Sequence, residues 1–102
     1  MTELFHPDDL YLPRVLYALS DPSRLHLIHE LTQATEIAST RFISVQAARG
    51  TIAHHLKVLQ LSGLTWTRIE GGRRLISLRR KDLDAHFPGL LDAVLTGFAS
   101  IE

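Results

Sequence analysis

The residues of this chain that could do chemistry are mainly cations, and the chemistry that they suit is non-covalent binding of phosphate. Residues 41–81 contain nine arginines and lysines against one acid, Glu70, although the chain as a whole has no net charge. Such a local field attracts a polyanion even when the whole molecule is neutral. A solvated basic surface without a ligand is the simpler alternative. We favour binding to nucleic acid, because the basic stretch coincides with elements that could present it.

The first of these elements is an amphipathic helix that ends near Gly63. Ile52, Leu56 and Leu59 recur at helical spacing, which predicts an inward stripe and leaves His54 and Lys57 on the opposite face. A glycine just past such a run is typical of a helix C-terminus.

The second element is a hairpin with a basic tip. Two β-prone runs, 64–69 and 75–78, flank Gly71-Gly72, and two glycines between such runs predict a tight turn. Arg73 and Arg74 then lie beside that turn, on a ribbon that suits a DNA backbone. A helix followed by a basic hairpin indicates a winged helix-turn-helix fold: mainly α, with about five helices and a two-stranded wing.

The rest of the chain predicts further helices in one domain, 1–102. Asp8-Asp9 could cap a first helix that runs to about Leu19, and Asp21-Pro22 could start a second through about Thr32. The segment 35–46 lacks a clean period, and we interpret it as a short helix that opens the helix-turn-helix, 35–61. The wing occupies 64–79. A last helical region, 82–102, follows it, and Pro88 could divide this region in two.

Composition excludes several classes of protein. There is no cysteine, so neither a disulfide nor a thiolate metal site can form. No apolar run is long enough to cross a bilayer and the N-terminus is polar, so we expect a cytoplasmic protein without a membrane partner. The His54-His55 pair, Asp82 with Asp84, and the Gly71-Gly72 turn could suggest an enzyme. None is arranged as nucleophile, base and orienting group, so we predict no catalysis.

Two segments resemble one known family. LYALSDPSRLHLIHEL and TIAHHLKVLQLSGLTWTRIEGGRRLISL are similar to the second helix and to the recognition helix and wing of the ArsR (arsenical-repressor) transcription factors. The resemblance covers roughly residues 12–95. It implies a homodimeric repressor that binds a pseudo-palindromic double-stranded DNA operator and leaves it when an effector binds. The alternative is a winged helix used for protein contacts, with weak and nonspecific affinity for DNA.

The resemblance also implies which residues contact DNA. Arg49, Thr51 and His54 would face base edges, whereas Lys57 and the wing arginines would hold phosphates. Small hydroxyl residues, common in the family, are replaced here by Ala48, Gly50 and Ala53, which places more of the readout on Arg49 and His54. His55 is expected to pack inward. The full predicted set is Arg41, Gln46, Arg49, Thr51, His54, Lys57, Arg68, Arg73 and Arg74.

The resemblance places the dimer interface on the first and last helices, within 1–20 and 82–102. The residues expected there are apolar: Leu10, Tyr11, Leu91, Val94, Leu95 and Phe98. The alternative is that both helices simply close the core of a single chain.

Histidines and acids provide weak metal-site candidates. Asp84 and His86 match half of a ligand pattern found on the last helix of some relatives, and His26 with His29 forms a second pair at helical spacing. Two ligands per chain seldom make a zinc site, and His26 and His29 are expected to face solvent. We therefore predict no metal and no cofactor, and leave a small-molecule effector open.

Overall fold

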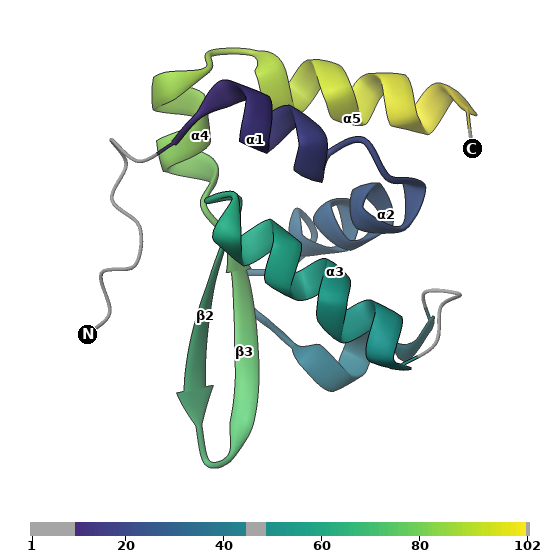
Figure 1. The fold of residues 1–102 in the computed structure, drawn as a ribbon, viewed down its shortest axis with the longest axis vertical. Coiled ribbons are helices and arrows are strands. Elements are labelled where there is room, and N and C mark those ends of the chain that lie inside the picture. The colour runs from purple at the N-terminus through teal and green to yellow at the C-terminus, as the bar shows by residue number, and fades with distance from the viewer. Residues whose placement is uncertain (1–9, 45–48, 102) are drawn as a thin grey trace.

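The computed structural model describes residues 10–44 and 49–101. Its elements are α1 (Leu12–Ala18), α2 (Pro22–Leu31), β1 (Ile37–Ala38), the 3-10 helix η2 (Ser39–Ser44), α3 (Arg49–Leu61), β2 (Thr65–Glu70), β3 (Arg73–Leu78), α4 (Arg80–His86) and α5 (Leu90–Ile101). Helices α1, α4 and α5 lie at one end of the molecule, and the β2–β3 hairpin projects from the other (Figure 1). Five α-helices and this hairpin confirm the predicted winged helix-turn-helix fold.

The start of α2 follows directly from its sequence. Asp21 is the N-cap, and its Oδ1 accepts hydrogen bonds from the backbone N–H groups of Ser23 (2.8 Å) and Arg24 (3.3 Å). Pro22 occupies the first helical position, where no N–H is needed. Both features agree with the predicted helix start.

The predicted stop of α3 at Gly63 is confirmed. Gly63 has φ +89°, and the N–H of Leu64 donates to the carbonyl of Leu59 at 3.0 Å. This is the pattern in which a left-handed glycine lets the chain turn back over the last helical turn. Because α3 ends there, the next residues enter β2 directly and the wing is held close to the helix.

The wing is a hairpin joined to a third strand that the sequence analysis missed. Glu70 pairs with Arg73 around Gly71 (φ +58°) and Gly72 (φ +79°), which confirms the predicted turn. Strand β1 pairs with the other side of β3, so the strand order is β1-β3-β2. The helix predicted over 35–46 is therefore wrong for its first part, where β1 occupies the edge of the sheet, whereas residues 39–44 form the short 3-10 helix η2. Gln46 lies outside the described residues.

The first and last helices differ from prediction at their starts. Helix α1 follows Tyr11, which provides no side-chain cap, and the expected caps Asp8 and Asp9 lie outside the described residues. At the other end, the helical region is interrupted between α4 and α5 at Pro88-Gly89, where Gly89 has φ +82°. The predicted division of the last helical region at Pro88 is confirmed.

One apolar core joins every helix to the sheet. Its well-buried residues come from all parts of the described chain: Val15, Ala18, Leu27, Ile28, Phe42, Leu59, Leu64, Ile76, Leu83 and Leu91.

None of the helices within residues 10–44 and 49–101 is both long enough and apolar enough to cross a bilayer.

Candidate nucleic-acid interface

One face of α3 is exposed and polar. Thr51, His54 and Lys57 follow one another at three-residue intervals, so they share a face of the helix, and all three are exposed. The opposite face is buried through Ile52 and Leu59. Burial therefore orients α3 so that hydroxyl, imidazole and ammonium groups point outward together.

The remaining predicted contacts near α3 are described only in part. Arg41 lies in η2 and is exposed. Arg49 is the first residue of α3, but its side chain lies outside the described residues, as does the whole of Gln46.

His55 and Arg24 attach α3 to α2 in the interior. His55 is buried, with 7% of its surface exposed, and its Nδ1 lies 3.1 Å from Arg24 Nη1. Arginine has only donors, so Nδ1 accepts and the neutral imidazole carries its proton on Nε2. That atom lies 3.9 Å from Oδ1 of Asp21. The predicted inward, hydrogen-bonded histidine is confirmed.

Arg24 also ties down the end of α1. Its Nε donates to the carbonyl of Ala18 at 2.7 Å and its Nη2 to the carbonyl of Tyr17 at 3.2 Å.

Burial lowers the pKa of His55; the Asp21 carboxylate opposes this shift, and the Arg24 charge adds to it. The unprotonated ring is therefore the form that fits this interior site.

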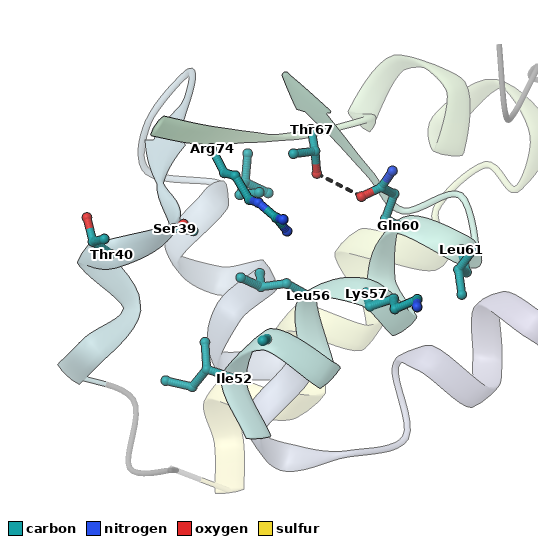
Figure 2. A pocket seen from close by; sticks show the side chains of 11 residues that line it. Ser39, Thr40, Ile52, Leu56, Lys57, Gln60, Leu61, Thr67 and Arg74 are labelled. Carbon is teal, nitrogen blue, oxygen red and sulfur yellow. Dashed lines mark hydrogen bonds between the residues drawn. The ribbon is translucent and has the colours of Figure 1, made fainter. Parts of the chain in front are cut away.

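The two wing arginines lie on opposite faces of the hairpin. Side chains alternate along a strand, so Arg74 shares a face of β3 with Ile76, whereas Arg73 shares the other with Leu75. Figure 2 shows Arg74 extending from the wing toward α3, above Leu56. Both arginines are exposed, and no carboxylate of the described residues forms an ion pair with either. Their positive charges are therefore available to an external anion.

Arg68, another predicted DNA contact, is already paired. Its Nε and Nη2 donate to Glu36 at 2.6 and 2.9 Å, and its Nη1 contacts Glu70. The hydrogen bond from Arg68 lowers the pKa of Glu36, and both carboxylates raise the pKa of Arg68. Two carboxylates compensate this guanidinium, so it joins the wing to the residue before β1 rather than adding a free cation.

Two more cations of the basic stretch are compensated inside the chain. Arg79 is buried, lies over the Trp66 ring at 4.2 Å from its centroid, and donates to Asp82 at 3.1 Å. Arg80 contacts Asp92 and lies 3.4 Å from Asp84. The usable positive charge is therefore smaller than the composition of 41–81 predicts. Among the described side chains of this stretch, the exposed cations without an ion pair are Arg41, Lys57, Arg73, Arg74 and Lys81.

The helix and the wing are also joined by a polar contact that the sequence analysis missed. Thr67 Oγ1 donates to Gln60 Oε1 at 3.0 Å, from β2 to α3 (Figure 2). Gln60 continues the three-residue spacing of Lys57 on the exposed face of α3, and extending that spacing by one step would have identified it.

The metal-site candidates do not converge. In the described part of the chain, no three histidines or acids are grouped closely enough to hold an ion. Asp84 pairs with Arg80, His86 Nδ1 lies 3.2 Å from the Asp82 carbonyl oxygen, and the His26 ring packs edge-on against Phe98. His26 and His29 are exposed, as predicted.

The residues predicted for a dimer interface fall into two groups. Leu91 and Phe98 are buried in the single chain, where they close its core. Leu10, Val94 and Leu95 are partly buried, whereas Tyr11 is 58% exposed. Helix α1 and the residue before it also expose large apolar side chains at this end of the molecule, namely Tyr11, Leu12, Leu16 and Tyr17, which are 41–61% exposed.

These features define a winged helix-turn-helix protein with a cationic wing and an exposed helix face. No protein-family model matches the chain. It is 30% identical over 89 residues to the uncharacterized HTH-type transcriptional regulator YceK of Bacillus subtilis, covering 85% of this chain and 89% of that protein. It is 33% identical over 73 residues to the arsenical resistance operon repressor of Staphylococcus xylosus, covering 72% and 70%.

Solved structures agree with these relatives. The crystal structure of a possible transcriptional regulator for arsenical resistance superposes with a TM-score of 0.64 at 27% identity, over 85% of this chain and 94% of that one. That of an ArsR family transcriptional regulator gives a TM-score of 0.67 at 20% identity, over 88% and 93%. The chain belongs to the ArsR family of helix-turn-helix transcriptional regulators. These relatives are regulators and repressors, not enzymes, in agreement with the sequence analysis.

Proposed function

We propose that this regulator is a cytoplasmic homodimeric repressor that binds a pseudo-palindromic operator and leaves it when an effector binds. Helix α3 would enter the major groove, and the wing would lie on the neighbouring backbone. The observation that carries the proposal is the exposed face of Thr51, His54 and Lys57, beside a wing whose Arg73 and Arg74 have no ion-pair partner among the described residues.

The contacts divide by chemistry. Arg49 and His54 are assigned to base edges, because their donors can address guanine and other acceptors in the major groove. Lys57, Arg73, Arg74 and the exposed Arg41 are assigned to phosphates, which position the protein without reading sequence. Arg68 leaves this set, since two carboxylates already compensate its charge.

The proposed dimer is supported by the apolar surface of α1. Leu12 and Leu16 lie one helical turn apart and are 41% and 45% exposed, so together with the exposed Tyr11 and Tyr17 they offer apolar surface that a partner chain would cover. The partly buried Val94 and Leu95 of α5 would contribute at the edge. A two-fold dimer would place its α3 helices on half-sites about 34 to 36 Å apart, or a multiple of this.

The test is a titration of the protein into labelled DNA from its own upstream region and into scrambled DNA, followed by fluorescence anisotropy at several salt concentrations. The proposal expects affinity for the upstream DNA ~10³-fold or more above the scrambled DNA, with a steep loss on adding salt. Weak and equal affinity for both would contradict it.

A second candidate function is docking on another protein. The observation in its favour is that two side chains that cannot form hydrogen bonds are exposed where DNA contacts are expected. These are Ile69 on the wing, which is 70% exposed, and the exposed Ala53 on α3. The same titration separates the two functions, because a docking module would bind both DNAs weakly and alike.

A further inference from the structure

A hollow of about 810 Å³ lies between α3 and the wing (Figure 2). One wall is α3, the opposite wall is formed by β2 and β3, and Ser39 and Thr40 of η2 lie at one end. This volume is within the range of small-molecule sites in proteins.

Part of the lining of this hollow is apolar. These side chains are Ile52, Leu56 and Leu61 from α3 and Ile76 from β3. Leu61 is 49% exposed. It lies at the C-terminal end of α3, far along the helix from the predicted base contacts. A phosphate makes no favourable contact with such a surface, whereas an apolar ligand would remove it from water.

The rest of the lining is mostly cationic or polar. Lys57 from α3 and Arg74 from β3 both belong to it, and no acidic residue of the part of the chain that the structure describes lines the hollow. Hydroxyl and amide groups accompany them, from Ser39, Thr67 and Gln60. Two like charges that line one hollow without a counter-charge favour an anionic group, and arginine binds carboxylates well because its donors form a planar fork.

We propose that this hollow binds an amphipathic organic monocarboxylate, with its carboxylate held by Lys57 and Arg74 and its apolar body lying on Leu56, Leu61 and Ile76. This ligand would be the effector of the proposed repressor, so the proposal rests on the proposed function. Lys57 and Arg74 are the same groups that are assigned to DNA phosphates. Ligand and operator therefore compete for one pair of cations, and release needs no rearrangement of the fold.

The test is isothermal titration of decanoate into the DNA-free protein. We expect saturable binding of decanoate, and much weaker binding of acetate, which lacks the apolar body, and of octanol, which lacks the charge. Arg74→Ala should weaken decanoate binding about tenfold or more, because a charge-assisted contact is lost. Arg73→Ala is the matched control: it removes the same charge from the other face of the same hairpin and should leave binding within about twofold.

The apolar wall is tested by Leu61→Ser, because Leu61 is exposed and its replacement should leave the fold intact. Circular dichroism melting checks the fold of each variant. We expect it to weaken decanoate binding about threefold. In the anisotropy assay, decanoate at ten times its own dissociation constant should raise the apparent dissociation constant for upstream DNA about tenfold, and octanol should not.

The outcomes separate this inference from the proposed function. No saturable binding of decanoate, or equal losses in Arg73→Ala and Arg74→Ala, would overturn the anion site even if the protein binds its operator tightly. Binding of decanoate that depends on Arg74, in a protein that shows no preference for upstream DNA, would support the site and overturn only the operator.

Discussion

Arg24 of α2 and His55 of α3 are hydrogen-bonded in the interior, with 3.1 Å between Arg24 Nη1 and His55 Nδ1. The same guanidinium donates to the carbonyls of Ala18 and Tyr17 at the end of α1. One side chain of α2 thus contacts both α1 and α3, the helix that carries the proposed base contacts.

Arg24→Ala should therefore lower the free energy of unfolding by about 2 to 4 kcal/mol, because it leaves buried acceptors without donors and removes a buried stem. Urea unfolding followed by circular dichroism measures this. Arg14→Ala is the control: Arg14 is exposed on α1, so its loss should change stability by less than about 0.5 kcal/mol. Similar losses in the two variants would contradict the role of Arg24.

Acid should destabilise the protein through His55. Because burial holds the pKa of His55 below the ordinary value of 6.5, the unfolded chain takes up a proton first as the pH falls. This contribution to stability is complete above pH 6.5, declines as the pH falls through 6.5, and levels off below the folded-state pKa.

The measurement is the urea midpoint between about pH 8 and pH 5, a range that spans the ordinary histidine pKa. His55→Gln should flatten the curve in this range, whereas His54→Gln, which removes only the last and smallest cause of the lowered pKa of His55, should change the slope much less. Identical slopes for wild type and His55→Gln would show that other groups cause the pH dependence.

Releasing Arg68 should strengthen binding to DNA. Glu36→Gln removes the carboxylate that Arg68 contacts through two nitrogens, and leaves that guanidinium only partly compensated on the wing. We expect roughly threefold tighter binding to scrambled DNA and a salt slope steeper by up to about 0.9. Glu30→Gln makes the same charge change at an exposed site on α2, and equal gains from the two would mean that only net charge matters.

Loss of Arg49 and loss of Lys57 should have different effects on DNA binding. Arg49→Ala should cost ~1 to 3 kcal/mol on the upstream DNA and much less on scrambled DNA, if Arg49 reads a base. Lys57→Ala should weaken both DNAs alike and reduce the salt slope by about 1. Competition anisotropy with the two DNAs distinguishes them, and equal losses for Arg49→Ala would exclude base reading.

A charge on α1 should dissociate the proposed dimer. Leu16→Glu adds a carboxylate to an exposed apolar position, so each chain should keep its fold while the two-fold interface is lost. Light scattering coupled to size exclusion should then give the mass of one chain. Ile69→Glu, at a more exposed apolar site on the wing, should leave the mass unchanged, and a dimer in both variants would place the interface elsewhere.

The sequence predicted the elements whose signals are local. Pro22 after Asp21, Gly63 after an amphipathic run, and the Gly71-Gly72 pair each determine a backbone conformation within a few residues, and the structure has all three. Strand β1 was missed because its two residues are stabilised by pairing with β3, almost forty positions along the chain, and have no period of their own.

Charge composition indicates a basic stretch, but not which of its cations are left without an ion pair. Arg68 pairs with Glu36, and Arg80 with Asp92, across sequence separations of 32 and 12 residues. Local spacing indicates only their other partners, Glu70 and Asp84. Arg73 and Arg74 are adjacent in sequence and were assigned the same role. Only the register of the hairpin places Arg74 toward α3 and Arg73 away from it.

Trp66 is the single tryptophan of the chain, and it lies on β2 under the guanidinium of Arg79, the residue that precedes α4. Its indole is therefore an intrinsic fluorophore at the contact between the wing and the C-terminal helices. A charge over the ring and partial exposure to water both influence indole emission, so any movement of the wing against those helices would change the emission spectrum. Any binding event that moves the wing can thus be followed in solution on the unmodified protein, with no added dye.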